Sequence, residues 1–153
     1  MEIRYHWKTK FFSKKFDIYW NEILRGELFK EHLSRRVSGE LNTKRYQFEA
    51  KGFLKREILI TDQQKHVETG RIQISWRRSD AVISYMEKEY KWKFENFICS
   101  RWSLSDDMRV LIKYHSSAFS GLIESYTEDE LLILSGFFIR NFIRKRLQRS
   151  ATV

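Results

Sequence analysis

The sequence predicts a mainly β protein, a closed antiparallel barrel of about twelve strands that encloses a hydrophobic C-terminal helix at roughly residues 127–148. Three observations lead to this prediction. Short segments of alternating polarity, rich in aromatic and β-branched residues, fill residues 2–125. An apolar run with helix start signals follows them. The chain contains no proline, so every strand keeps its backbone donors for a closely paired ladder.

The composition indicates one basic globular domain over residues 1–153. The chain has 29 Lys and Arg against 20 Asp and Glu, a net charge of +9, and 42% of its residues are hydrophobic. Such a chain can bury a core, which excludes a disordered protein. The single cysteine, Cys99, cannot pair within the chain, which excludes a disulfide scaffold and favours a reducing compartment.

The predicted strands are separated by short polar connections. We expect strands at residues 3–8, 16–20, 26–33, 37–41, 46–51, 54–61, 67–76, 81–86, 90–96, 98–104, 109–115 and 119–126. Connections at residues 42–44, 87–89 and 105–107 have the length of hairpin turns. Strands that are neighbours in sequence should therefore pair in the sheet.

The alternation of side chains indicates one buried face and one solvated face. In residues 90–95, Tyr90, Trp92 and Phe94 share one face, and the lysines and the glutamate between them share the other. Residues 45–51 and 71–77 divide in the same way. A parallel sheet is disfavoured, because its strands would be apolar on both faces and separated by helices.

The period changes after Tyr126. Thr127 and Glu130 have the spacing of a capping box, which predicts that the helix begins at Thr127. Apolar residues then cover every direction of the helical wheel, so the helix should be buried on all sides. About twelve strands leave room for one helix, whereas an eight-stranded barrel is filled by its own side chains. We interpret Gly136 as a site of close packing. The alternative, a two-sheet sandwich with the helix outside, would leave one flank of residues 131–139 in water.

One charge tests the threaded arrangement. An uncompensated guanidinium of Arg140 inside the barrel would cost several kcal/mol. We therefore expect Arg140 at a barrel mouth or beside a carboxylate. Phe142 and Ile143 should close that mouth, and Arg144 and the basic residues after it should emerge into solvent.

Residues 1–10 lack the apolar core of a secretory signal, so we expect a cytoplasmic protein, at most peripheral at a membrane. The apolar stretch of residues 131–143 is shorter than the roughly 20 residues of a transmembrane helix and is interrupted by Arg140. The sequence therefore predicts no transmembrane span.

No motif indicates catalysis, a metal or a cofactor. The four histidines stand far apart, and the six glycines stand singly rather than in a phosphate-binding loop. Ser116 lies between His115 and Ser117, near Asp106, but no nucleophile elbow surrounds it. Cys99 is interpreted as a small buried hydrophobe in a strand. We expect a protein that is not an enzyme and has no metal site and no cofactor.

Basic residues come in doublets, which makes them candidates for binding an anionic partner. Near an anionic membrane each Lys or Arg contributes about 1 kcal/mol. The alternative is a solvated barrel exterior. The candidate anion-binding residues are Lys14, Lys15, Arg35, Arg36, Lys44, Arg45, Arg77, Arg78, Arg144, Lys145 and Arg146. Nucleic acid is a disfavoured partner, because aromatic and basic side chains alternate between opposite faces, whereas a base-stacking groove needs both on one face.

The chain resembles the tubby C-terminal-like superfamily, which includes the tubby proteins, the LURP-one-related proteins and the phospholipid scramblases. The resemblance lies in the order of strands, the opening Trp7 to Ser13 (WKTKFFS) and the start of the terminal helix at Asp129 to Leu134 (DELLIL). It implies a barrel of about twelve strands around a hydrophobic helix, and anionic phospholipid headgroups as the partner. The expected function is thus a non-enzymatic interaction module that binds such headgroups through its basic surface. The alternatives are a nucleic-acid-binding or protein-scaffold barrel and a scramblase-like membrane-associated protein.

Overall fold

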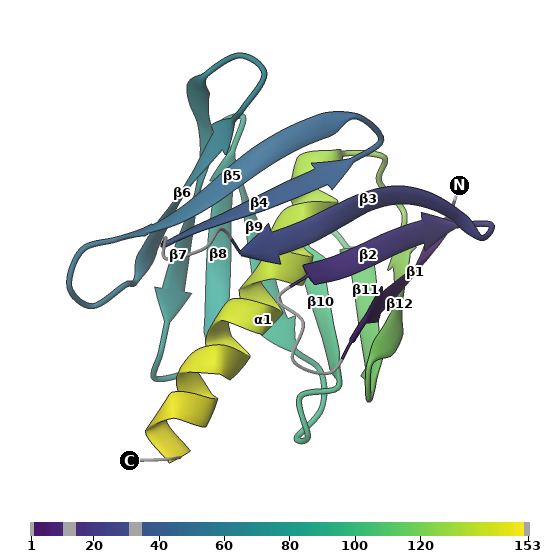
Figure 1. Ribbon diagram of the computed structural model, residues 1–153. Helices are drawn as coiled ribbons and strands as arrows, with labels where there is room; N and C mark the ends of the chain where they lie inside the picture. The colour runs from purple at the N-terminus through teal and green to yellow at the C-terminus, as the bar shows by residue number, and fades with distance from the viewer. Residues whose placement is uncertain (1, 11–14, 31–34, 152–153) are drawn as a thin grey trace.

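The structure is a computed structural model that describes residues 2–10, 15–30 and 35–151, with the side chains of the final helix described up to Lys145. Twelve strands and one helix, α1 (Glu130–Ala151), make up the fold (Figure 1). The strands are β1 (Ile3–Thr9), β2 (Lys15–Trp20), β3 (Ile23–Lys30), β4 (Arg36–Leu41), β5 (Lys44–Lys51), β6 (Glu57–Asp62), β7 (Val67–Ser75), β8 (Asp80–Tyr85), β9 (Lys88–Phe94), β10 (Arg101–Ser105), β11 (Val110–Ser117) and β12 (Ser120–Ser125).

The strands form a closed antiparallel barrel in sequence order. Each strand pairs with its neighbours in the chain, and β1 pairs with β12 to close the sheet, with Ile3 opposite Ser125 and Lys8 opposite Ser120. Helix α1 runs along the interior (Figure 1). The predicted barrel is confirmed, and the alternative of a two-sheet sandwich is wrong.

Two-residue turns join several hairpins. Both residues of the Asn42-Thr43 turn have positive φ angles (48° and 72°), the geometry of a type I′ turn, which matches the twist of paired strands. Met86 and Glu87 form a second such turn (51° and 62°). The predicted connection at 87–89 was therefore placed one residue late, and Lys88 already belongs to β9.

Three strands begin three residues away from their predicted starts: β3, β10 and also β6, which begins at Glu57 rather than at residue 54. β10 begins at Arg101 rather than at residue 98, because the Asn96 side chain accepts hydrogen bonds from the backbone N–H groups of Ser100 (3.0 Å) and Arg101 (3.1 Å) and closes a loop. Cys99 lies in this loop with a φ of 59° and is partly exposed, so its predicted place in a buried strand is wrong. β3 begins at Ile23 instead of residue 26, directly after a turn at Asn21-Glu22.

The helix begins later than its sequence signal indicates. Asp129, not Thr127, is the N-cap, since its carboxylate accepts hydrogen bonds from the N–H groups of Leu131 (3.0 Å) and Leu132 (3.3 Å). The Thr127 hydroxyl accepts from Asp129 N instead (3.2 Å), and the Thr127 carbonyl accepts from Ser125 Oγ (2.6 Å). These bonds hold residues 125–129 in the turn that carries the chain from the barrel wall to its axis.

Aromatic side chains fill the space between the strands and α1, whose residues 131–140 are all buried. Phe48 stacks on Phe138 at 4.6 Å between ring centroids, and Trp7 lies 5.2 Å from Phe137. Tyr90 and Trp92 point inward, while Lys91 and Lys93, which alternate with them, are exposed. The predicted division of faces is therefore confirmed. The expected closure is also seen, because Ile143 is fully buried and the ring of Phe142 stacks on Phe138.

Candidate functional site

The barrel has two chemically different ends. Because the strands are antiparallel and follow one another, successive connections alternate between the ends. We call the end where Asp129 caps α1 the cap end; its connections are residues 21–22, 42–43, 63–66, 86–87, 106–109 and 126–129. The opposite end, from which α1 emerges, is the exit end; its described connections are residues 10, 35, 52–56, 76–79, 95–100 and 118–119.

Charge is segregated between these ends. The cap-end connections and the first helical residue carry mostly acids: Glu22, Glu87, Asp106, Asp107, Glu128, Asp129 and Glu130, against the bases Lys65 and Arg109. The described exit-end connections carry Lys10, Arg35, Lys55, Arg56, Arg77 and Arg78, against the acid Glu95. Arg144 and Lys145 add to the exit end as α1 leaves the barrel. Much of the positive charge among the described residues therefore faces one direction.

The structure brings together most of the predicted anion-binding residues that it describes. Lys15, Arg35, Arg36, Arg77, Arg78, Arg144 and Lys145 lie at or beside the exit end. Lys44 and Arg45 begin β5 at the cap end, away from the other candidates, because a doublet gives no information on which end of a strand it occupies. Lys14 and the side chain of Arg146 lie outside the described residues.

Several of these cations are partly neutralised. Arg36 pairs with Glu49 (2.7 Å), and Lys15 pairs with Glu27 (3.0 Å). The Arg36 guanidinium also lowers the pKa of Glu49, with help from Lys51. By contrast, Arg56, Arg77 and Arg144 are exposed and form no ion pair within the described part of the chain. Lys10 and Arg35 are exposed and unpaired in the same way, and together these five residues provide positive charge that is accessible to a partner.

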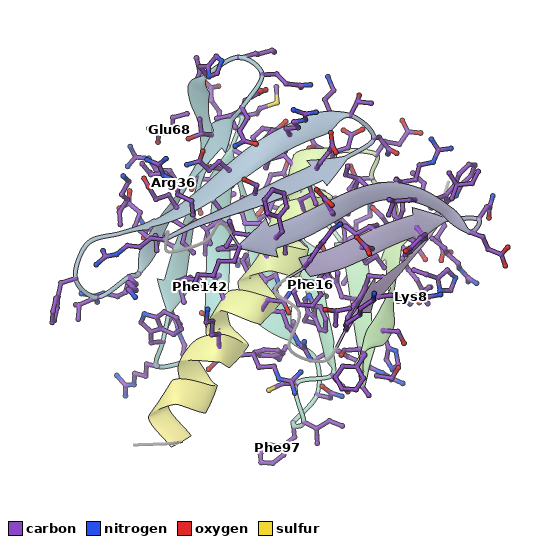
Figure 2. The ribbon with its side chains drawn as sticks, viewed as in Figure 1. Lys8, Phe16, Arg36, Glu68, Phe97 and Phe142 are labelled. Atoms are coloured by element: carbon purple, nitrogen blue, oxygen red, sulfur yellow. The ribbon has the colours of Figure 1, made fainter. Side chains whose placement is uncertain are left out.

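Apolar side chains project from the same end. Phe97 is fully exposed at the tip of the loop between β9 and β10, and Ile98 beside it is also exposed (Figure 2). Phe53 is 95% exposed in the loop between β5 and β6, next to exposed Leu54. The polarity pattern of the sequence does not predict these tips, because it places Leu54 and Ile98 in strands. Gly52 and Asn96, each directly before a phenylalanine, were the turn signals that could have revealed both loops.

The most unusual side chain at this end is Arg140. It is only 5% exposed and contacts no carboxylate among the described residues. Its Nη2 donates to Ser116 Oγ (3.2 Å), its guanidinium carbon lies 4.9 Å from the centroid of the Trp102 ring, and its buried Nε has no hydrogen-bond partner. Burial, and secondarily repulsion from Arg144, lowers the pKa of Arg140 to about 10. Arg140 thus lies near a mouth, as expected, but without a carboxylate.

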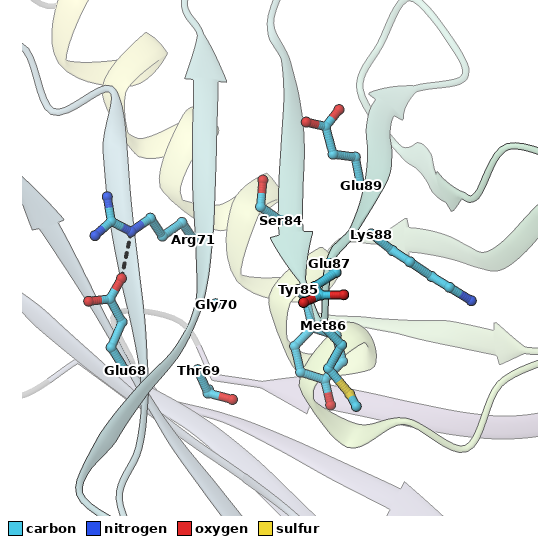
Figure 3. A pocket seen from close by; sticks show the side chains of 10 residues that line it. All are labelled: Glu68, Thr69, Gly70, Arg71, Ser84, Tyr85, Met86, Glu87, Lys88 and Glu89. Atoms are coloured by element: carbon cyan, nitrogen blue, oxygen red, sulfur yellow. Dashed lines mark hydrogen bonds and ion pairs between the residues drawn. The ribbon is translucent and has the colours of Figure 1, made fainter.

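A hollow of about 540 Å³ lies near the cap end between β7, β8 and β9 (Figure 3). Glu68, Glu87 and Glu89 line it together with Arg71 and Lys88. Arg71 is already paired with Glu68 (2.5 Å) and Glu57 (2.9 Å). The hollow is open, polar and of mixed charge.

Among the described residues no three His, Cys, Asp or Glu side chains lie close enough together to hold a metal ion. No helix in the described ranges combines the length and the apolar character needed to cross a membrane.

The fold and its exit end thus define a closed twelve-stranded barrel threaded by its own C-terminal helix, with a basic, apolar-tipped end. Comparisons with protein-family models, with curated proteins and with solved structures give no significant match.

Proposed function

We propose that the protein is an interaction module that binds anionic phospholipid surfaces through the exit end of its barrel. The observation that carries the proposal is that exposed phenylalanine loop tips and unpaired cations meet at the exit end, whose described connections carry one acid, whereas the exposed methionines of the cap end lie among several acids. The resemblance to the tubby-like superfamily points to the same class of partner and, like the expected cytoplasmic location, stays a prediction.

Apolar tips and cations suit the two layers of a membrane surface. Phe97 extends from the loop between β9 and β10 on the side where α1 emerges (Figure 2). Phe53 is exposed in the loop between β5 and β6, at the same end of the barrel. Transferring one exposed phenylalanine side chain from water into an apolar layer gains about 1.5–3 kcal/mol. Each cation near anionic headgroups gains about 1 kcal/mol. Neither kind of group needs a deep pocket for this interaction.

The acidic cap end would orient the molecule. Glu87, Asp106 and Asp107 would be repelled by the headgroups that attract Arg56 and Arg77. The axis of α1 would then be roughly perpendicular to the membrane surface, and Arg144 would lie at the level of the headgroups without the helix entering the bilayer. Nucleic acid is a weaker candidate, because Tyr90 and Trp92, which alternate with lysines, face the core and offer no stacking surface.

The proposal is tested by co-sedimentation with vesicles of phosphatidylcholine alone or mixed with phosphatidylserine. We expect binding to the anionic vesicles only, with release by salt. Arg56→Gln with Arg77→Gln should weaken binding about thirtyfold, for two lost charges of about 1 kcal/mol each. Lys44→Gln with Arg45→Gln removes the same charge from the cap end and is the matched control, which should bind nearly as the wild type does.

A second pair of variants tests the apolar tips. Phe97→Ser should weaken vesicle binding about tenfold or more, whereas Met108→Ser, at an exposed position of the cap end, should leave it unchanged. Equal losses in the exit-end and cap-end variants, or no binding to anionic vesicles at low salt, would contradict the proposal. Binding of an oligonucleotide but of no vesicle would favour the nucleic-acid alternative.

A further inference from the structure

We propose that Arg140 and Arg144 form a binding site for the phosphate group of a phosphate monoester at the exit end of the barrel. The site lies between α1 and the wall formed by β10 and β11, beside the loop of residues 95–100. This inference goes beyond binding of a membrane surface, because it assigns one buried group and one chemical class of ligand.

The guanidinium of Arg140 is buried and pairs with no carboxylate among the described residues. Buried guanidinium groups in proteins are normally compensated by carboxylates, since the cost of removing a charge from water is several kcal/mol. Within the described part of the chain, the guanidinium of Arg140 contacts the Ser116 hydroxyl and the face of Trp102, which are both neutral. Cys99 also acts on it electrostatically and by itself raises the pKa of Arg140, but no carboxylate pairs with it and its Nε–H donor has no acceptor among the described residues. A bound anion would supply both a negative charge beside the guanidinium and an acceptor for the Nε–H donor.

The one acid in the loop of residues 95–100 is bonded to another side chain and does not pair with Arg140. The loop of residues 95–100 contains one acid, Glu95, and its carboxylate accepts a hydrogen bond from Ser103 Oγ (2.5 Å). Trp102 and Leu104, the neighbours of Ser103 in β10, point into the barrel, so Ser103 and Glu95 meet on its outer face. The loop therefore provides no carboxylate for Arg140, and of its side chains Cys99 is the one that acts electrostatically on the guanidinium.

Arg144 lies one helical turn beyond Arg140 on α1. It follows Arg140 by four residues on α1, so the two guanidinium groups lie on one side of the helix, and Arg144 is exposed where α1 leaves the barrel. Their mutual repulsion helps to lower the pKa of Arg140. Such a like-charge pair is unfavourable by itself and becomes favourable when an anion lies between its members.

Charge and geometry favour a phosphate monoester over a carboxylate. Two guanidinium groups carry two positive charges, and a phosphate monoester carries about −1.5 to −2 at neutral pH, whereas a carboxylate carries one negative charge. Arginine side chains also present parallel N–H donors that match two phosphate oxygens. The phosphate could belong to a soluble metabolite or to a lipid headgroup, and both sources offer the same chemistry.

The test compares thermal unfolding and calorimetric binding with glycerol 3-phosphate and inorganic phosphate, against chloride at constant ionic strength. We expect both phosphates to raise the unfolding temperature of the wild type and to bind at one site. Arg144→Gln should weaken binding about tenfold, and Arg140→Met should abolish it. Arg109→Gln removes an exposed arginine at the cap end and is the matched control, expected to bind as the wild type does.

The stability of Arg140→Met shows whether a loss of phosphate binding comes from the lost guanidinium or from a failure to fold. Arg140→Met should fold, and without phosphate it should unfold at a higher temperature than the wild type, because it removes an uncompensated buried charge. A response to phosphate that is the same in wild type and Arg140→Met would overturn the inference, as would no response in the wild type.

Vesicles distinguish the two sources of phosphate. If the ligand is a headgroup, vesicles with phosphatidic acid, a monoester, should bind more tightly than vesicles with phosphatidylserine, a diester, and Arg140→Met should remove the difference. If the ligand is soluble, the difference should be absent while glycerol 3-phosphate still binds. Arg56→Gln with Arg77→Gln should not change the response to glycerol 3-phosphate, so this inference and the proposed membrane function can fail separately.

Discussion

The phenol of Tyr114 occupies the space that a side chain at residue 136 would need. A Cβ atom built on Gly136 would lie 2.2 Å from Tyr114 Oη. The same hydroxyl donates a hydrogen bond to the carbonyl of Ile133, one turn earlier in α1 (2.8 Å). The absence of a side chain at Gly136 therefore lets β11 approach the helix closely enough to bond its backbone.

Gly136→Ala is expected to destabilise the protein, although the same change in most helices is stabilising. Alanine is favoured over glycine by about 1 kcal/mol in a helix interior. Here the added methyl group would overlap Tyr114, and overpacking of this kind costs about 1–3 kcal/mol. Urea unfolding measures the change in free energy. Unchanged or increased stability of Gly136→Ala would show that the helix and β11 are not packed this closely.

A second prediction concerns the two indoles that meet at the same helical carbonyl. Trp92 Nε1 and Trp102 Nε1 donate to the carbonyl oxygen of Gly136 at 2.9 Å and 3.1 Å. Trp92→Phe and Trp102→Phe should each cost roughly 0.5–1.5 kcal/mol for the lost hydrogen bond, plus the lost packing. Because the two donors share one acceptor, the double variant should differ from the sum of the single variants by 0.5 kcal/mol or more. Strict additivity in urea unfolding would contradict a shared acceptor.

The architecture could be predicted because it depends on patterns that run through the whole chain. Alternating polarity gave the strands and their faces, and the apolar surface of α1 required an enclosing sheet. The errors are local. Asn96 closes a loop through two backbone N–H groups, and this single turn signal is followed by the hydrophobic residues Phe97 and Ile98, which resemble the start of a strand.

The candidate surface was less predictable, because it depends on which end of each strand a residue occupies. The doublets Arg77-Arg78 and Lys44-Arg45 look alike in the sequence, but they lie at opposite ends of the barrel. The environment of Arg140 depends on a neutral hydroxyl and an indole from two distant strands, Ser116 in β11 and Trp102 in β10. The sequence indicated that Arg140 needed a partner but could not identify these groups.

The start of α1 gives a third prediction. Asp129→Ala should cost about 0.5–2 kcal/mol, because it removes the acceptor of two helical N–H groups. Thr127→Ala should cost less, since the Thr127 hydroxyl accepts a bond from Asp129 N and contacts no N–H group of the helix among the bonds described. Chemical denaturation of both variants tests this order. A larger loss for Thr127→Ala would restore the capping box that the sequence pattern predicts.

Removal of the helix is a fourth prediction. A chain that ends at Tyr126 should not fold, because aromatic side chains such as Phe48 and Trp7 would lose their partners Phe138 and Phe137 and would line an open cavity. Near-ultraviolet circular dichroism and urea unfolding measure the effect. A soluble truncated protein that unfolds cooperatively would mean that the barrel does not depend on its axial helix.

The last prediction concerns alkaline pH and rests on tyrosines that face the core. Burial raises the pKa of Tyr46 to about 12 and that of Tyr114 well above 10. In the unfolded chain both phenols ionise near pH 10, so the stability they contribute is full below about pH 10 and is lost as the pH rises toward their folded pKa values.

Arg140 acts in the opposite direction, because its folded pKa, about 10, lies below its usual value. Its contribution to stability therefore increases above pH 10. The free energy of unfolding should thus fall between pH 10 and 12, less steeply in Tyr114→Phe and more steeply in Arg140→Met than in the wild type. Urea unfolding at stepped pH values measures these slopes, and the same slope in all three proteins would contradict the burial of both groups.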